Sequence, residues 1–329
     1  MTATDLLPLE EARARILEDV LPLRAESTPL AEALGRVLSE DATALLTLPP
    51  WDNSAMDGYA VRSEDVAGAT AELPVVLDVV GEVAAGHEPE CAVGPGTAAR
   101  VLTGAMMPPG ADAIVKVEDT DAAAGLAELP TRVAVRVPVP AGKDIRTAGS
   151  DMRQGDHLLS TGTRVTPAVI AVLAAAGHAR INVHRRPRVG IISTGDELTP
   201  LGEPLGPASI PDSNGESLAA QVRAAGAEPV RLGIAIDDRD VVRDRLREGI
   251  LAADVLVVSG GVSVGAHDVV TVVCSEVGTG GLWRVAILAG WPLAYGCAPR
   301  RGGGDCVLGG LPGNRVGSSG SLGRFVRPV

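Results

Sequence analysis

The segment Val189-Gly190-Ile191-Ile192-Ser193 is apolar until its last residue, and Val255–Ser259 repeats this pattern sixty-odd residues later in the chain. Between them lie a helical pattern near residues 216–225, a strand at 230–236 and a second helical pattern at 239–250. Apolar strands that alternate with helices predict a parallel sheet covered on both faces. Ligands of such sheets bind beyond the carboxyl ends of the strands. The loops after Ser193 and Ser259 are therefore expected to share one binding edge.

The loops at these strand ends carry residues suited to an anionic ligand and a cation. Glycines in Ser259-Gly260-Gly261-Val262-Ser263-Val264-Gly265 let backbone N–H groups approach a phosphate, although a plain tight turn is the alternative. The carboxylates in Ser193-Thr194-Gly195-Asp196-Glu197 suit a hard divalent cation, although Asp196 could instead cap a helix. Asp237-Asp238, at the next strand end, is equally open to capping or ligand contact.

An unusual loop, Asp52-Asn53-Ser54-Ala55-Met56-Asp57-Gly58-Tyr59-Ala60, precedes this sheet by more than a hundred residues. Its turn-forming residues predict an irregular segment that presents oxygen ligands, with a surface turn as the alternative. From residue 48 to 142 glycine and proline are frequent and strand-like runs are short, which predicts an inserted β domain. Helices are expected at 8–22, 30–35 and 166–177.

The composition excludes several classes of function. Aromatic residues are only 2% of the 329 residues and the net charge is −12, so nucleic acid is not an expected partner. The four cysteines form no CxxC pair, which argues against a zinc site. No apolar run suggests a membrane span and the N-terminus lacks a signal-peptide pattern, so a cytoplasmic location is expected.

Together with Leu102-Thr103-Gly104-Ala105, the order of these motifs resembles the molybdopterin molybdotransferases, the family of MoeA and the gephyrin E domain. The resemblance runs from about residue 5 to the last residue. It implies an α/β multidomain fold in three parts. These are a discontinuous linking and dimerisation domain (1–47 and 143–180), an inserted β-rich domain (48–142) and a three-layer molybdopterin-binding domain with a parallel-rich sheet (181–329).

The resemblance also implies an activity, the Mg²⁺-dependent insertion of molybdate into adenylylated molybdopterin with release of AMP. The implied catalytic residues are Asp57, Thr103, Glu197, Asp268 and Arg284, and the implied metal ligands are Glu197, Asp237 and Asp268. The implied molybdopterin-binding residues are Ser193, Thr194, Gly195, Asp196, Ser259, Gly260, Gly261, Ser263, Gly265, Pro312, Gly313 and Asn314. A homodimer with a composite site is expected, with the molybdopterin adenylyltransferase or molybdoenzymes as protein partners.

The chain departs from the family pattern in three places. Arg284, Leu288 and Trp291 stand where the family usually has lysines, so two cations are lost. A charge-assisted hydrogen bond is worth about 1.5–3 kcal/mol, so two losses would cost about two to four orders of magnitude. Arg315 follows Asn314 where the family has proline, and the sequence ends before the family's final β-barrel.

These departures leave two hypotheses open. The first is an active transferase in which Arg300, Arg301 or Arg315 replaces the missing charge. The second is a catalytically impaired paralogue that binds molybdopterin or a partner as a carrier or scaffold. An insertion assay separates them.

Overall fold

The computed structural model describes residues 7–18, 20–122, 128–261, 269–285, 291–300 and 304–326. The chain divides into two compact units. One, called here the α/β unit, comprises Met1–Glu26 with Val183–Val329; the other, the β-rich unit, is Ser27–Asn182. The finer division into three domains stays a prediction.

A six-stranded sheet forms the centre of the α/β unit, in the order β15-β12-β16-β19-β18-β17. The strands are β15 (Glu228–Ala235), β12 (Arg188–Thr194), β16 (Val255–Ser259), β19 (Asp305–Leu311), β18 (Trp291–Pro299) and β17 (Thr279–Val285). The first four are parallel, and β18 is antiparallel to both of its neighbours. The prediction of a parallel-rich sheet is therefore confirmed.

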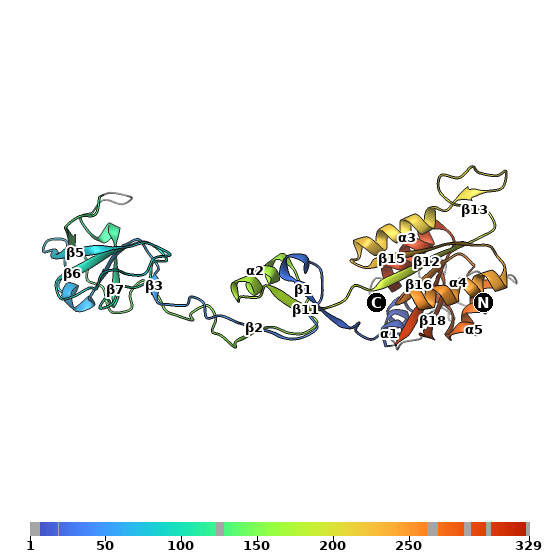
Figure 1. Ribbon diagram of the computed structural model, residues 1–329, viewed down its shortest axis with the longest axis horizontal. Helices are drawn as coiled ribbons and strands as arrows, with labels where there is room; N and C mark the ends of the chain where they lie inside the picture. Colours follow the sequence, from blue (N-terminus) through green and yellow to red (C-terminus); the bar gives the residue numbers. More distant parts are fainter. Residues whose placement is uncertain are drawn as a thin grey trace. The chain divides into compact units, whose positions relative to one another are not determined.

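Helices cover both faces of this sheet, which gives the three layers expected (Figure 1). One face packs against α1 (Leu9–Glu18), α3 (Ser213–Ala224), α6 (Arg315–Ser321) and the π-helical turn Leu322–Val326. The other packs against α4 (Arg239–Ala252) and α5 (Val269–Val277). Ile191 of β12 belongs to the first core and Ile192 to the second. Because alternate side chains enter different cores, the strand must be apolar throughout.

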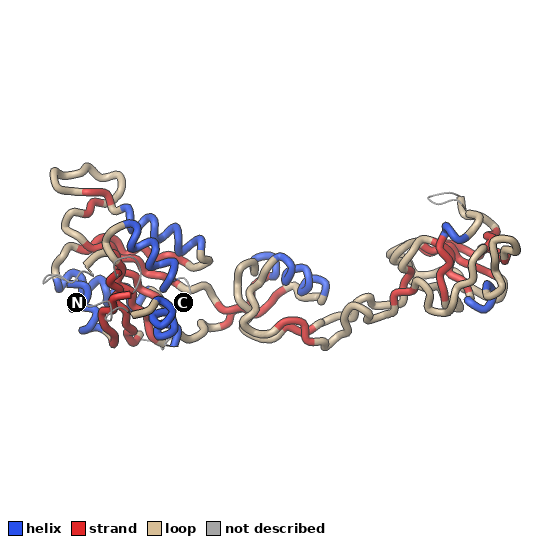
Figure 2. Tube along the Cα trace, turned by 180° about the vertical axis from the view of Figure 1, so that it is seen from behind, coloured by secondary structure: helices blue, strands red, loops and turns tan. Residues whose placement is uncertain are grey.

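The β-rich unit contains a five-stranded sheet in the order β7-β4-β6-β5-β8. Its strands are β4 (Gly58–Val61), β5 (Val75–Val83), β6 (Thr97–Val101), β7 (Ala113–Lys116) and β8 (Arg132–Val135). Strands and loops dominate this region (Figure 2). Three further strand pairs involve this unit: β1 (Ala25–Pro29) with β11 (Arg180–His184), β2 (Ala42–Thr43) with β10 (His157–Leu159), and β3 (Asn53–Ser54) with β9 (Ile145–Arg146). In the α/β unit, β13 (Leu198–Thr199) pairs with β14 (Ile210–Pro211).

Some local predictions were wrong. The expected helix at 30–35 is only a 3₁₀ turn, Leu30–Glu32, and the first helix ends at Glu18 rather than near residue 22. The loop expected at 52–60 contains the short strand β3 and the start of β4. Helix α2 (Pro167–Ala175) forms as expected, and the Thr166 side chain caps it by accepting from the Val169 N–H.

A buried carboxylate fixes the chain where β16 begins. Asp254 Oδ1 and Oδ2 each accept a 2.6 Å hydrogen bond from Arg185, and Arg300 and the Arg188 N–H donate at 2.7 and 2.8 Å. Burial opposes ionisation of Asp254, but these hydrogen bonds outweigh it and lower its pKa from 3.8 to about 2. The ionised carboxylate therefore stabilises the folded state.

The stability contributed by Asp254 is expected to depend on pH. Because the pKa of Asp254 is lower in the folded protein than in the unfolded chain, its ionised carboxylate stabilises the fold fully at pH values above the unfolded pKa of 3.8. This stabilisation is lost as the pH falls towards the folded pKa of about 2. The shift corresponds to about 2 kcal/mol. Urea unfolding of the wild type and Asp254→Asn should show a gap in unfolding free energy that narrows by about 1–2 kcal/mol between pH 5 and pH 2. A gap independent of pH would contradict this assignment.

Candidate functional site

The parallel register places three loops side by side at the carboxyl edge of the α/β sheet. Ser193 of β12 is opposite Ser259 of β16, and Ser259 is opposite Leu311 of β19. The segments that follow, 195–197, 260–261 and 312–314, therefore start from neighbouring strands. These are the segments that the sequence singled out, so the structure brings the expected loops together.

The glycines in these loops allow backbone to approach backbone. Gly260 and Gly261 have φ values of +108° and +64°, which side-chain-bearing residues rarely adopt. A Cβ on Gly260 would lie 2.6 Å from both the carbonyl oxygen and Oγ1 of Thr194. A Cβ on Gly313 would lie 3.4 Å from the Gly260 Cα. At this edge the loops therefore pack backbone against backbone, with little room for side chains at the glycines.

Asn214 joins two of these loops; from the sequence, Pro211-Asp212-Ser213-Asn214 was about equally open to helix capping and to ligand contact. Its Nδ2 donates to Ser259 Oγ at 2.9 Å and to the Gly313 carbonyl oxygen at 2.6 Å. The neighbouring Asp212 caps α3 by accepting from the Gly215 N–H, and it also accepts from Ser193 Oγ, both at 2.9 Å. The capping role in this cluster belongs to Asp212, which leaves Asn214 to hold the edge together.

Two buried polar atoms at this edge have no partner among the described residues. They are Thr194 Oγ1 and Asn214 Oδ1. Thr194 is 6% exposed, and an unsatisfied buried polar group costs about 1–3 kcal/mol. A bound molecule with hydrogen-bonding groups would satisfy both atoms, so the edge has the properties of a ligand site.

Four carboxylates follow the ends of β12 and β15 at the same edge: Asp196, Glu197, Asp237 and Asp238. Asp196 Oδ1 accepts from the Asp237 N–H at 3.0 Å. The Glu197 carboxylate lies over Gly195, where an added Cβ would come within 2.5 Å of Oε2. Asp238, and not Asp237, caps α4 by accepting from the N–H groups of residues 240 and 241.

These carboxylates fit the chemistry of a magnesium site only in part. Across the described residues, no group of three or more His, Cys, Asp or Glu could hold a metal ion. Mg²⁺ usually takes one or two carboxylates, with waters and substrate phosphates as its other ligands. Glu197 and Asp237 are exposed oxygen donors of the kind required. The fit is therefore to a cation that a phosphate-bearing substrate helps to bind.

Several predicted residues cannot be placed in this way. Ser263, Gly265 and Asp268 lie outside the described residues, as do Leu288 and Arg301. Arg284, near the end of β17, pairs in register with Pro292 of β18, and Trp291 begins β18. Because β17 runs parallel to β19, the changed positions Arg284 and Trp291 also belong to the carboxyl edge.

The basic residues proposed to replace the lost lysines lie in different places. Arg300 follows β18 and donates to Asp254 and to the Ala253 carbonyl oxygen, at the amino end of β16. It is therefore at the opposite edge of the sheet and cannot replace the missing charge. Arg315 directly follows Asn314, is exposed, and has no side-chain partner among the described residues.

A second cluster lies in the β-rich unit around Asp57. Asp57 Oδ1 accepts from the Thr103 N–H at 2.7 Å and from Thr103 Oγ1 at 2.8 Å. These two hydrogen bonds lower the pKa of Asp57, which keeps the carboxylate ionised. At Gly58 a Cβ would lie 2.0 Å from the Val115 carbonyl oxygen, so this chain position requires glycine. Asp57 and Thr103, paired in the structure, were both predicted.

Two lysines accompany this cluster, although sequence reasoning did not assign them to the site. Lys116 Nζ and Lys143 Nζ lie 4.0 and 3.7 Å from the carboxylate of Asp144. Asp144 has a φ of +54°, and its carbonyl oxygen accepts from the Ala55 N–H in the Asp57 loop. Lys116 is opposite Gly58 in the sheet register. The sequence offered only the alternation of side chains along a strand, which does not show that Lys116 and Lys143 lie beside Asp144.

The comparisons with known proteins match both parts of the chain. Residues 7–177 match the model of the MoeA N-terminal region (domain I and II), and residues 190–329 match that of a probable molybdopterin binding domain. A Mycobacterium tuberculosis protein named molybdopterin molybdenumtransferase 2 is 41% identical over 326 residues, covering 97% of this chain and 78% of its own. A Nostoc molybdopterin molybdenumtransferase is 40% identical, covering 92% and 68%.

Solved structures give the same result. A molybdopterin biosynthesis MoeA protein from Pyrococcus has a TM-score of 0.81 and 32% identity, covering 98% of this chain and 78% of that one. Within the described part of the chain, no helix has the length and apolar character that a bilayer crossing requires.

Proposed function

We propose that this chain, which belongs to the MoeA family of molybdenum cofactor biosynthesis, is a transferase that inserts molybdate into adenylylated molybdopterin and releases AMP. The observation that supports this most is the carboxyl edge of the α/β sheet. There, glycine-lined backbone, two unsatisfied buried polar atoms and exposed carboxylates lie together. Such an edge suits a ligand with a hydrogen-bonding ring system and phosphate groups.

The pterin and phosphates would be held mainly by polar backbone and neutral side chains. Thr194 Oγ1 and Asn214 Oδ1 would pair with polar atoms of the ring system. The Gly261 N–H would face phosphate oxygens, since the Gly260 N–H already donates to the Leu311 carbonyl oxygen. Ser263, Gly265 and the segment 312–314 would complete this surface.

Glu197, Asp237 and Asp268 would hold Mg²⁺ together with the substrate's phosphoanhydride. When bound, the cation would offset the charge that develops as the AMP-releasing bond breaks. Glu197 is suited to this role because its carboxylate has no protein partner among the described residues and is positioned over Gly195. Asp196 positions the loop through its bond to the Asp237 N–H.

The Asp57 cluster would act across a homodimer, completing the site of the partner subunit. Asp57 and Thr103 would position molybdate or the dithiolene end of the substrate, and Lys116 and Lys143 would supply positive charge. These two lysines are significant because Leu288 and Trp291, at the family's lysine positions, carry no positive charge. The chain's net charge of −12 makes such local cations necessary for anionic substrates.

Subunit mixing tests this arrangement. Asp57→Asn and Glu197→Gln proteins should each be inactive, and the mixture after subunit exchange should regain up to about a quarter of wild-type AMP release. Half of the dimers are then mixed, and each has one site with both residues intact. Homodimers of each variant, measured at the same concentration, are the controls. A mixture as inactive as its components would overturn the composite site.

Arg315 is expected to contribute to substrate binding as a replacement for lost charge. Arg315→Ala should weaken adenylylated molybdopterin binding about tenfold, the effect of one charge-assisted interaction, and should reduce the salt dependence of binding. Arg247→Ala is the matched control, because Arg247 is exposed on α4 and, among the described residues, forms an ion pair with Asp244 alone. Unchanged affinity and salt dependence in Arg315→Ala would exclude the replacement.

The alternative function, a carrier or scaffold, is favoured by the apolar residues Leu288 and Trp291 at family lysine positions. A carrier would bind adenylylated molybdopterin or a protein partner, such as the molybdopterin adenylyltransferase or a molybdoenzyme, without turnover. Binding and turnover measured in the same sample distinguish these functions.

A further inference from the structure

A cavity of about 950 Å³ lies at the amino edge of the α/β sheet, opposite the site described above. Arg188, Glu228, Asp254 and Asp305 line it, and they lie at or next to the first residues of β12, β15, β16 and β19. Strand β12 has seven residues at about 3.3 Å each, so about 20 Å separates the two edges. Nothing in the proposed transferase reaction uses this cavity.

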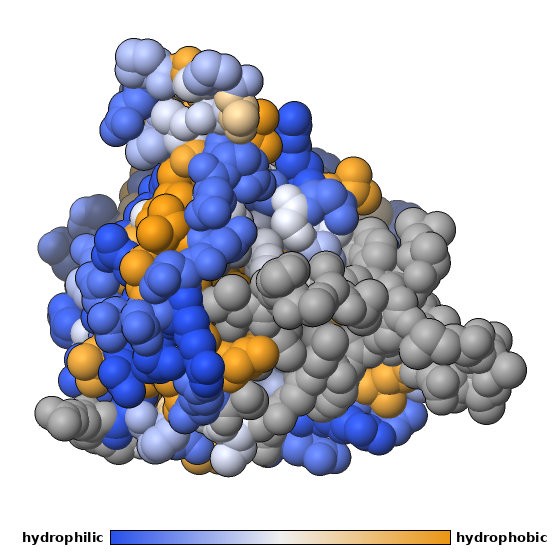
Figure 3. All heavy atoms as spheres, turned by 90° about the vertical axis from the view of Figure 1, so that its right-hand side faces the viewer, coloured by the Kyte–Doolittle hydropathy of each residue, from blue (hydrophilic) through white to orange (hydrophobic). Residues whose placement is uncertain are grey.

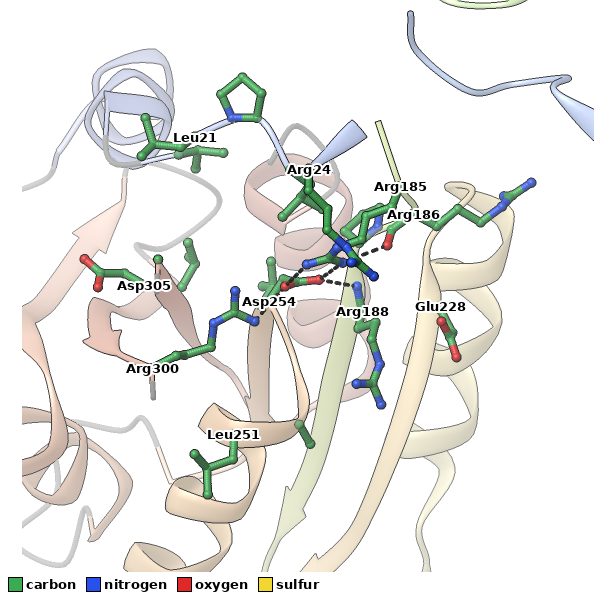
Figure 4. A pocket seen from close by; sticks show the side chains of 18 of the residues that line it. Leu21, Arg24, Arg185, Arg186, Arg188, Glu228, Leu251, Asp254, Arg300 and Asp305 are labelled. Atoms are coloured by element: carbon green, nitrogen blue, oxygen red, sulfur yellow. Dashed lines mark hydrogen bonds and ion pairs between the residues drawn. The ribbon is translucent and has the colours of Figure 1, made fainter. Parts of the chain in front are cut away.

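Among the described residues, five arginines line the cavity: Arg24, Arg185, Arg186, Arg188 and Arg300 (Figure 4). Asp254 holds two of them, with a bidentate pair to Arg185 and a single bond to Arg300. One carboxylate thus serves two guanidinium groups, and Arg300 Nε remains without an acceptor among the described residues. This pair is fixed in place and retains a surplus positive charge.

Two further guanidinium groups have no acceptor in the described part of the protein. Arg24 and Arg188 are exposed, and neither side chain makes a hydrogen bond or ion pair with another described residue. Arg186 is used in part, since its Nη1 donates to the Gly226 carbonyl oxygen. Although the chain has a net charge of −12, a cluster of arginines with free N–H donors attracts anions locally.

The other lining residues restrict the ligand. Glu26, Glu228 and Asp305 also line the cavity, so a highly charged polyanion would be repelled. Leu21 and Leu251 line it as well and are 77% and 63% exposed, which provides an apolar surface beside the arginines. Planar guanidinium groups bind phosphate oxygens in pairs. The volume is that of a small-molecule site.

We propose that this cavity binds a small organic phosphate monoester. The phosphate contacts Arg24, Arg188 and the anchored Arg185, and the apolar body packs on Leu251. The site is separate from the transferase edge, so its occupancy does not depend on the proposed reaction.

Titration calorimetry at constant ionic strength tests the proposal, with phenyl phosphate and inorganic phosphate as probes. Phenyl phosphate should bind several-fold more tightly than inorganic phosphate, and Leu251→Asn should remove that advantage. The double variant Arg24→Gln/Arg188→Gln should bind phenyl phosphate at least about tenfold more weakly. Both arginines are exposed and unpaired, so these changes leave the Asp254 network and the fold intact.

The controls decide which site is measured. Arg247→Gln, an exposed arginine of α4 outside the cavity, should bind as the wild type does. Equal affinity in the double variant and the wild type would overturn the proposal, as would loss of binding in Arg315→Gln instead. Equal affinity for the two probes would overturn the assignment to an organic phosphate.

Discussion

Asp57→Asn is expected to lower the rate of molybdate insertion by about 100-fold or more while leaving the thermal midpoint nearly unchanged. Asparagine keeps the Oδ1 acceptor for the two Thr103 hydrogen bonds but removes the charge. The loop therefore stays in place, and only the ionised carboxylate, which the lowered pKa ensures, is lost. Misplaced or missing positioning groups cost rates of this size. Single-turnover AMP release measures the effect.

The matched control is Asp65→Asn in the same unit. Asp65 is also a carboxylate that anchors a loop, accepting from the Gly96 N–H at 2.9 Å, although it is half-buried. It lies outside both site clusters, so insertion should change less than twofold or so. If Asp57→Asn retained wild-type rates, the Asp57 cluster would have no part in the reaction.

Gly260→Ala is expected to abolish measurable substrate binding and to destabilise the α/β unit by about 3 kcal/mol. The new Cβ would lie 2.6 Å from the Thr194 carbonyl oxygen and Oγ1, and φ is +108° at this position. The β16 loop must move, which separates it from Asn214 and the Gly313 loop. Calorimetric binding and urea unfolding report the two losses separately.

Gly233→Ala separates backbone strain from steric clash. Gly233 also has a positive φ, +81°, but nothing lies within 4 Å of a Cβ placed there. Strain alone should cost about 1–2 kcal/mol without changing substrate affinity. If both variants bound substrate equally well, close approach at Gly260 would not be needed for the site.

The parallel sheet could be predicted because its physical cause is local in sequence. A strand buried on both faces must be apolar at every position, so Val255–Ser259 was predicted with the bounds that the structure shows. Strand β4 could not be predicted in this way. Gly58 is a turn former by composition, and pairing with β6 and β7 at residues 99–101 and 113–116 determines its conformation. Such distant contacts override local preference.

In the candidate site, too, features that depend on local sequence were predicted and those that depend on distant contacts were not. Loops that follow predicted strands were identified, because parallel strands present their carboxyl ends together. Lys116 was not identified, and Asn214 was left open between helix capping and ligand contact, since the role of each depends on which distant atoms it meets. Arg300 illustrates the limit most clearly. It is close in sequence to Trp291, but the nine-residue strand β18 carries the chain across the sheet to the opposite edge.

The central claim is that this chain inserts molybdate and does not only bind molybdopterin. The most direct test incubates purified protein with adenylylated molybdopterin, Mg²⁺ and near-physiological molybdate, and measures AMP and active cofactor in the same samples. The account predicts that both products appear in equal amounts, and that both are lost in Glu197→Gln. Tight binding of adenylylated molybdopterin with neither product formed would contradict the transferase and leave a carrier.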